Sequence, residues 1–141
     1  MSGLRLREFD LDRDYDAVVA LWEAAPGVHV GNSDTREALA LKLTRDPDLF
    51  LVATISDRVV GAVLGGFDGR RGMVYHLAVD SAHHRQKIAT ALMDELERRL
   101  LAKGCPKAYL LVIPDNGNAL AFYQQRGWSA EPLTFMSKRL T

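Results

Sequence analysis

The sequence contains a single cysteine, Cys105, among its 141 residues. One thiol cannot form a disulfide within the chain, and it leaves a structural zinc site without its usual sulfur ligands. Cys105 follows Gly104, where a helix is expected to end, so no helix N-terminus is at hand to activate the thiol. We therefore expect neither a disulfide nor a cysteine nucleophile.

Excess charge is also missing, because lysine plus arginine and aspartate plus glutamate number 18 each. A balanced chain has no overall electrostatic attraction to nucleic acid or to an anionic membrane. A nucleic-acid site built on Arg70, Arg71, Arg85 and Lys87 would have few basic residues and no interleaved aromatics. We expect no nucleic-acid partner and no membrane partner.

Long apolar segments are absent as well. No hydrophobic run approaches the length that crosses a bilayer. The first residues are charged from Arg5 onward and lack the apolar stretch of a signal peptide. The expectation that follows is a cytoplasmic protein.

The residues that are present suit one globular domain spanning 1–141. Hydrophobic residues make up 48% and charged residues 26%, a composition that can form a core and keep the surface polar. The sequence has no Gly-x-x-x-x-Gly-Lys phosphate loop and no Gly-x-Ser-x-Gly nucleophile turn. The oligomeric state, monomer or homodimer, stays open.

Hydrophobic periodicity predicts strands and helices along the whole chain. Strands are expected at 4–9, 49–55, 59–67, 73–79, 108–113 and 133–138. Helices are expected at 11–25, 34–46, 88–103 and 116–126, with caps at Asp10 or Asp12, at Asp34 with Glu37, and at Asn116 or Asp115.

The connections between these segments predict the topology. Short turns make the strands at 49–55, 59–67 and 73–79 antiparallel. The run at 108–113 is continuously apolar, as in a strand buried on both faces, and the helix before it places it parallel to the strand at 73–79. The fold class is therefore α/β, with a mixed, mostly antiparallel sheet and about four helices.

The stretch from Val79 to Ile88 has the layout of an anion site. An apolar strand ends at Val79, a turn with basic side chains follows, and a helix begins near Ile88. The first N–H groups of a helix lack partners, and the helix dipole favours negative charge there. We interpret the turn as a pyrophosphate site, with room for the ligand left by the small Ala89 and Thr90. A solvated basic loop is the alternative.

A second cluster lies on the last predicted helix, from Asn116 to Tyr123, with Gly127 and Trp128 after it. The phenol of Tyr123 is a proton donor while it is un-ionised. The alternative is a core tyrosine on an amphipathic helix, with Asn116 acting only as the helix cap.

Three histidines, His76, His83 and His84, lie close together in the sequence. The strand and turn that carry them do not supply a cysteine or carboxylate at the usual ligand spacing. We expect no metal site.

Together the two clusters resemble the GNAT superfamily of acyl-CoA N-acyltransferases. That family has the pattern Asn-x-x-Ala-x-x-x-Tyr-x-x-x-Gly-aromatic on a late helix. The pattern is complete here in Asn116, Ala119, Tyr123, Gly127 and Trp128.

The phosphate turn of the family, Arg/Gln-x-x-Gly-x-Gly/Ala, is matched less well. By helix register His84 stands at the first position, Lys87 at the first glycine and Ala89 at the last. The chain also resembles the small bacterial YpeA-type acetyltransferases, in the segments 50–53, 65–72 and 104–107.

The resemblance implies a GNAT-like sheet splayed open in the middle, between the strands that end near Val79 and Ile113. The pantetheine arm of the co-substrate acetyl-CoA would lie in the splay, bonded to Leu77 and Val79 like an added strand. The residues implied to bind the cofactor are Leu77, Ala78, Val79, His84, Arg85, Gln86, Lys87, Ile88, Ala89, Thr90, Asn116, Ala119, Phe122 and Tyr123.

The resemblance also implies direct attack of a neutral primary amine on the acetyl group in a ternary complex. Tyr123 would protonate the leaving thiolate, and a backbone N–H near Ala78 or Val79 would stabilise the oxyanion. The base that deprotonates the amine is either His76 or a relay of waters.

The acceptor would bind near residues 26–33 and 129–133, where His29, Asn32, Asp34 and Glu131 suggest a cationic or polar amine. The alternative is that these segments are ordinary solvated loops. The acceptor is an amine of a small molecule or of a peptide or protein. A protein N-terminus, a lysine, a polyamine, an amino acid and an aminoglycoside all stay open.

Lys87 is the main departure from the family pattern, and it favours an alternative in which the protein binds CoA or acts as a sensor without turnover. Glycine allows close approach and unusual φ values, whereas lysine keeps only the backbone N–H. If φ is helical, the lysine side chain can flank the phosphates, and we expect only a modest effect on CoA affinity. The complete Tyr123 pattern favours catalysis.

Overall fold

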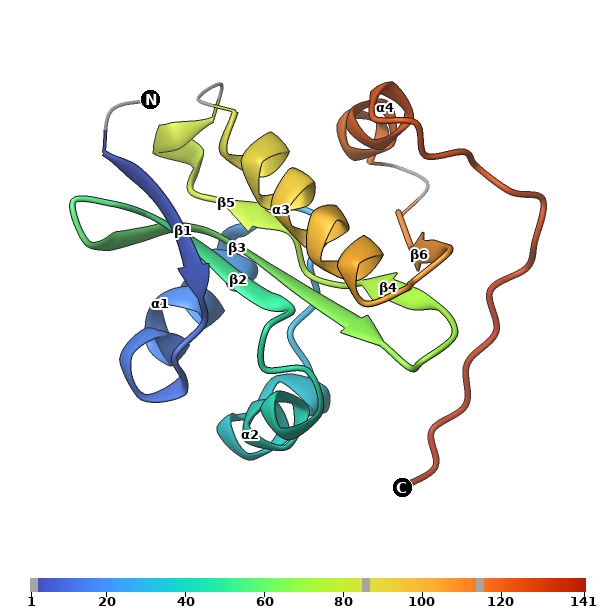
Figure 1. The fold of residues 1–141 in the computed structure, drawn as a ribbon, viewed down its shortest axis with the longest axis horizontal. Helices are drawn as coiled ribbons and strands as arrows, with labels where there is room; N and C mark the ends of the chain where they lie inside the picture. Colours follow the sequence, from blue (N-terminus) through green and yellow to red (C-terminus); the bar gives the residue numbers. More distant parts are fainter. Residues whose placement is uncertain (1–2, 85–86, 114–115) are drawn as a thin grey trace. The chain divides into compact units, whose positions relative to one another are not determined.

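The structure, a computed structural model, describes residues 3–84, 87–113 and 116–141 (Figure 1). These residues divide into two compact units, Met1–Leu111 and Val112–Thr141. In chain order the elements are β1 (Leu4–Glu8), α1 (Leu11–Ala24), the 3₁₀ turn η1 (Asn32–Asp34), α2 (Arg36–Arg45), β2 (Phe50–Ile55), β3 (Arg58–Phe67), β4 (Gly72–Val74), β5 (Ala78–Val79), η2 (Ser81–His83), α3 (Ile88–Ala102), β6 (Ala108–Leu110) and α4 (Gly117–Gln125).

All the strands of the described residues lie in the first unit and form one open sheet in the order β1-β2-β3-β4-β6, with β5 also pairing with β3. Every pairing is antiparallel except that of β4 with β6, which is parallel. The mixed, mostly antiparallel α/β fold with four helices among the described residues is therefore confirmed.

The strand expected at 73–79 is two strands. Four residue steps lead from Val74 to Ala78, but only three lead from Gly65 to Ala62, their partners on β3. The extra residue interrupts the ladder, so 75–77 belong to neither β4 nor β5. The hydrophobic pattern continues through this bulge, which is why the sequence did not reveal it.

Two other strand predictions were wrong. The run at 108–113 forms a strand only over 108–110, and Tyr109 is 41% exposed, because β6 is the last strand of the sheet order rather than a central one. The segment 133–138 forms no strand in the structure described for the second unit, and Phe135 and Met136 are exposed. An apolar β-prone segment becomes a strand only where an edge is available to pair with it.

Most helix caps follow the predicted chemistry. Asp10 accepts hydrogen bonds from the N–H groups of Asp12 and Arg13 and caps α1, and Asn116 accepts from Ala119 N and caps α4. The cap of α2 is Thr35, whose Oγ1 accepts from Ala38 N at 3.1 Å, and not the predicted Asp34. The Asp34 side chain is engaged elsewhere.

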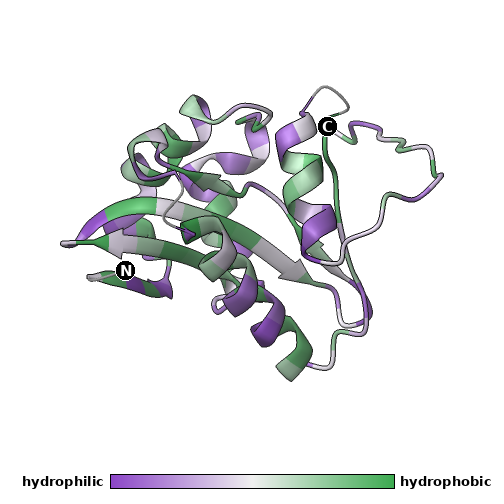
Figure 2. Cartoon of the chain, turned by 90° about the horizontal axis from the view of Figure 1, so that it is seen from above, coloured by the Kyte–Doolittle hydropathy of each residue, from purple (hydrophilic) through white to green (hydrophobic). Residues whose placement is uncertain are grey.

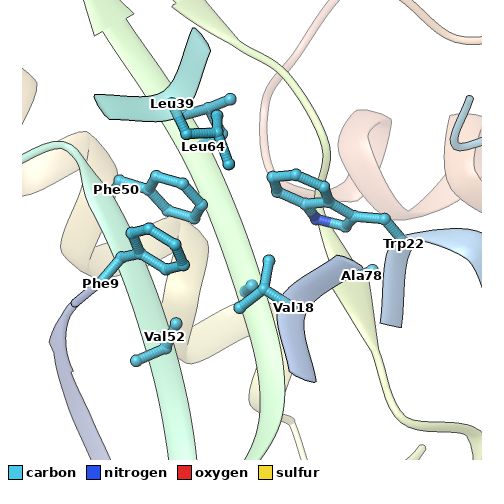
Figure 3. Close-up of a cluster of buried hydrophobic side chains, with 9 residues drawn as sticks. Phe9, Val18, Trp22, Leu39, Phe50, Val52, Leu64 and Ala78 are labelled. Carbon is cyan, nitrogen blue, oxygen red and sulfur yellow. The ribbon is translucent and has the colours of Figure 1, made fainter. Parts of the chain in front are cut away.

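One face of the sheet packs against α1 and α2 (Figures 1 and 3). Phe9 and Phe50 stack with their ring centroids 3.9 Å apart, and Trp22 of α1 stacks on Phe50 at 5.7 Å. Leu39 of α2 and Ala78 of β5 complete this cluster. The core therefore fixes β5 relative to α1.

The opposite face of the sheet packs against α3 (Figure 1), whose leucines at 92, 96 and 100 are buried. Glycines of β3 let this helix approach closely. A Cβ on Gly61 would lie 2.9 Å from Ile88 Cγ2, and one on Gly65 would lie 2.6 Å from Leu96 Cδ1. The strand glycines therefore determine how closely α3 packs against the sheet, and with it the position of the helix N-terminus.

Figure 2 shows hydrophilic and hydrophobic residues alternating along the helices. Most charged side chains of the described residues are exposed or half-buried. A notable exception is Asp14 of α1, which is 1% exposed and forms a two-point ion pair with Arg7 of β1, at 2.6 and 2.9 Å. Burial alone would raise the pKa of Asp14, but the hydrogen bonds from Arg7 and from the backbone of Asp10 hold it below its usual value. This pair ties the first strand to the first helix.

Candidate functional site

The short strand β5 has one edge paired. Ala78 and Val79 pair with Ala62 and Gly61 of β3, and Asp80 N donates to Val60 O at 2.8 Å. No strand of the described residues pairs with the other edge. An extended ligand with amide groups can therefore bond there as an added strand, which is the role that the resemblance to the GNAT family implies for Leu77 and Val79.

A hydrogen-bonded turn leads from β5 toward α3. Asp80 Oδ1 accepts from Ala82 N at 3.0 Å and caps η2. His84 Nε2 lies 3.1 Å from Val79 O, and since a carbonyl oxygen only accepts, Nε2 must carry the hydrogen. The His84 ring therefore braces the turn against β5.

Lys87 is the N-cap of α3 and adopts φ 59° and ψ 27°, the left-handed conformation. A helical φ, the condition under which the Lys87 side chain was expected to flank the phosphates, is therefore not met. Glycine adopts this region without strain, whereas a residue with a Cβ does not. The backbone thus has the conformation that the family's glycine would favour, although the residue is lysine.

The first turn of α3 offers backbone donors. Lys87 makes no side-chain cap hydrogen bond, and the first N–H groups of a helix have no intrahelical acceptors. The Ile88 side chain is 1% exposed, so this residue can contribute only its N–H group, while Ala89 and Thr90 are half-buried. The predicted contributions of Arg85 and Gln86 lie outside the described residues.

An open hollow of about 290 Å³ lies between α1 and the turn that follows β5. Alanine side chains of α1 line one wall, and Val79, Asp80, Ser81 and His84 line the other. The turn is therefore accessible from the α1 side of the sheet.

In the second unit, α4 carries the other predicted residues. The Tyr123 ring meets Phe122 at 5.2 Å and Trp128 at 6.0 Å, both edge to face. Burial raises the pKa of the Tyr123 phenol to about 12, and Arg126 offsets only part of this effect. The phenol is therefore protonated at neutral pH and can act as a proton donor. Asn116 caps the helix, and Ala119 lies in its first turn.

The structure brings together two side chains that sequence reasoning had treated separately. His76, in the bulge between β4 and β5, places Nε2 3.0 Å from Oδ2 of Asp34, at the end of η1. The two residues are 42 positions apart, so no local spacing could reveal the pair. The one signal was the extra polar residue inside an apolar strand.

Two features are absent from the described residues, 3–84, 87–113 and 116–141. These residues contain no group of three or more histidine, cysteine or acidic side chains that could hold a metal ion. None of their helices has both the length and the apolar character of a bilayer-crossing segment.

Sequence comparison assigns a family to this arrangement. Residues 15–128 match the acetyltransferase (GNAT) family profile. The chain belongs to the GNAT family. Similar relatives include an acetyltransferase of Pectobacterium atrosepticum, 39% identical over 97% of this chain and 96% of its own, and an acetyltransferase of Yersinia enterocolitica, 37% identical over 90% and 89%. The resemblance drawn from the two motifs is thereby confirmed.

Solved structures share the fold of this GNAT chain. Ard1 from Thermoplasma volcanium superposes with a TM-score of 0.79 at 24% identity, covering 89% of this chain and 82% of its own. The PaiA N-acetyltransferase from Thermoplasma acidophilum, solved in complex with coenzyme A, superposes with a TM-score of 0.79 at 18% identity, covering 95% and 94%. At these identities the likeness concerns the fold alone.

Proposed function

We propose that this GNAT protein transfers the acetyl group of acetyl-CoA to a primary amine by direct attack in a ternary complex. The observation that carries the proposal is the path, in chain order, from the unpaired edge of β5 to the turn braced by His84 and then to the N-terminus of α3. This path offers strand-like hydrogen bonds and then an anion site, in the order of the pantetheine arm and the pyrophosphate of CoA.

The residues proposed to bind acetyl-CoA keep the assignments of the sequence analysis. Leu77, Ala78 and Val79 would receive the pantetheine arm, residues 84–90 would hold the pyrophosphate, and Asn116 would line the cofactor side. The small Ala89 leaves space for phosphate oxygens. That PaiA was solved in complex with coenzyme A supports a CoA site in this fold.

The proposed chemistry needs no covalent enzyme intermediate. The amine nitrogen attacks the acetyl carbonyl carbon, and the carbon–sulfur bond then breaks. Tyr123, protonated at neutral pH, gives its proton to the leaving thiolate. Holding both substrates together supplies the proximity gain.

The competing proposal is a protein that binds CoA without turnover. The lysine at the glycine position of the turn favours it. Tyr123, whose phenol is un-ionised at neutral pH, favours catalysis instead, and the left-handed backbone of Lys87 supports CoA binding under either proposal.

Calorimetry with CoA tests the cofactor assignment. Wild type should bind, and CoA should raise the melting temperature, because a ligand of the folded state stabilises it. Ala89→Leu puts bulk at the anion site and should abolish binding, whereas the same change at the exposed Ala102, at the other end of α3, should leave it intact. Absence of any heat or melting shift in wild type at millimolar CoA would refute the assignment.

Turnover is tested by thiol release from acetyl-CoA with a panel of amines. The panel contains a peptide with a free N-terminus, an N-blocked peptide with one lysine, a polyamine, an amino acid and an aminoglycoside. Thiol release with matching mass gain on one amine supports the transferase. CoA binding without acetylation of any amine supports the non-catalytic alternative. A single domain over 1–141, a cytoplasmic location, and a monomer or homodimer stay predictions.

A further inference from the structure

The contact between Asp34 and His76 joins two parts of the first unit that are distant in sequence. Asp34 is 5% exposed, and its Oδ2 accepts from Gly31 N at 3.0 Å as well as contacting His76 Nε2 at 3.0 Å. The η1 turn therefore holds the carboxylate, and the carboxylate holds the ring.

The bulge between β4 and β5 points the His76 ring at this carboxylate. The ring lies edge to face against Trp22 at 4.7 Å, and the Trp22 indole N–H donates to His76 O at 3.2 Å. Backbone and ring are thus both fixed by α1. Bulges of this kind commonly redirect a side chain next to an active site.

The contact with Asp34 also determines which imidazole nitrogen of His76 carries the hydrogen. An ionised carboxylate only accepts, so Nε2 must donate, and a neutral ring then has its lone pair on Nδ1. Nδ1 has no hydrogen-bond partner among the described residues, and it is not one of the buried atoms closed off from solvent. About a fifth of the His76 side chain is exposed, compared with 6% for Asp34. The ring therefore presents an open acceptor.

We infer that His76 is the base that removes a proton from the acceptor's ammonium group, and that Asp34 is the positioning residue that holds the ring in the Nε2–H form. The inference rests on the proposed transferase function. His76 immediately precedes Leu77, Ala78 and Val79, which the proposal assigns to the pantetheine arm, and Asp34 directly follows residues 26–33, where the acceptor is expected to bind. The proposal therefore brings the amine to the open Nδ1 of this ring.

The protons balance as follows. An ammonium group that becomes an amide loses two protons. One passes to Nδ1 of His76 and on to solvent, which leaves the neutral amine to attack. The other is released from nitrogen as the amide forms and replaces the proton that Tyr123 gives to the thiolate.

Few other charged or titratable groups reach this pair within the described residues. From α1, Tyr15 donates its hydroxyl to Asp34 O at 3.0 Å, and from α2 the Arg36 guanidinium stacks on the Tyr15 ring at 4.6 Å. Tyr75 adjoins His76 in the chain, and burial together with Asp46 raises the pKa of its phenol. Within the part of the chain that the structure describes, Asp34 is thus the one carboxylate in contact with the ring.

The test measures kcat/KM of wild type and of His76→Gln over a range of pH, with the two peptides of the panel. The quantity of interest is how the loss in kcat/KM caused by the substitution depends on pH. A lysine ε-amine has a pKa near ~10.4 and an N-terminal amine one near ~8. At pH 7 we expect a loss of about 100-fold. The loss should shrink to roughly threefold as the pH approaches the pKa of the amine, because the amine then arrives already neutral. It should therefore fall to this roughly threefold level at a lower pH for the N-terminal amine than for the lysine.

Asp34→Asn should lower kcat/KM with the same kind of pH dependence, by about tenfold at pH 7. Asp16→Asn is the control, because the Asp16 side chain is 93% exposed, and it should behave as wild type. His76→Ala with added imidazole provides a second variant, and imidazole should restore at least part of its rate. CoA affinity should be unchanged in all four proteins.

A loss in His76→Gln that is equal at every pH, with no imidazole rescue of His76→Ala, would overturn the inference and leave the transferase standing. Failure of wild type to acetylate any amine while it still binds CoA would overturn the transferase proposal, and the role of the pair with it.

Discussion

Replacing Lys87 with glycine should stabilise the protein. Lys87 has φ 59° at the N-cap of α3, and the structure shows no side-chain cap hydrogen bond that would compensate for this conformation. Glycine adopts the same backbone without the clash between Cβ and the carbonyl oxygen. The perturbation removes strain and leaves the fold as it is.

The magnitude follows from two opposing effects. A residue with a Cβ in the left-handed region costs roughly 1–2 kcal/mol. Glycine gains freedom in the unfolded chain, which returns about 0.4–1 kcal/mol. The net effect is an increase of about 1 kcal/mol in the free energy of unfolding, or about 3 °C in Tm for a chain of this size. Chemical denaturation and calorimetry both measure it.

Lys87→Ala is the matched control, because it removes the lysine side chain and keeps the Cβ. It should show little or none of the gain. If Lys87→Gly is no more stable than Lys87→Ala, the left-handed conformation carries no cost and the reasoning fails. The affinity for CoA should change by less than about tenfold in Lys87→Gly, because the N–H groups keep their direction. A gain of a hundredfold would instead mark the wild-type turn as impaired.

Four further outcomes are expected. Tyr123→Phe should lower turnover by roughly ten- to a thousandfold and leave CoA affinity intact, and it should remove the phenol that ionises near pH 12 in an absorbance titration; unchanged turnover would make Tyr123 a packing residue. Gly65→Ala should destabilise by about 1–3 kcal/mol, since its Cβ would lie 2.6 Å from a leucine methyl of α3, whereas Gly31→Ala, with nothing within 4 Å, should not. The folded-state pKa of Asp14 lies below 3.8, so its share of the stability is present above that pH and is lost as the pH falls through the folded value; Asp14→Asn should flatten this acid dependence, and an unchanged profile would contradict the assignment. Chelator treatment should leave acetylation unaltered, and a loss that zinc restores would reveal a metal site.

Local signals were sufficient where the interaction that fixes an element is itself local. The α3 helix was predicted from leucines four residues apart and a glycine at its end, and Gly104 has the expected left-handed φ of 88°. The caps at Asp10 and Asn116 depend on hydrogen bonds two or three residues away. Such elements depend on residues that are close together in the sequence, so they can be predicted from a single sequence.

Strand boundaries were less predictable, since they depend on the partner. The hydrophobic pattern of 73–79 predicts one continuous strand. The bulge exists because the segment from Val74 to Ala78 has one residue more than the part of β3 with which it pairs. The run at 108–113 has the composition of a buried strand, but its burial is decided by whether another strand lies beyond it. The hydropathy of a segment does not show which strand will lie beside it in the sheet.

For the candidate site, the sequence alone indicated the family, which is confirmed, and predicted the anion turn and the tyrosine helix, because each is a short motif with a fixed spacing. Only the tertiary structure showed that Lys87 is left-handed and that Asp34 meets His76. A φ angle at a helix start depends on how the helix is seated, here on the glycines of β3. A contact across 42 residues depends on the packing of α1 against the sheet, and no spacing along the chain encodes it.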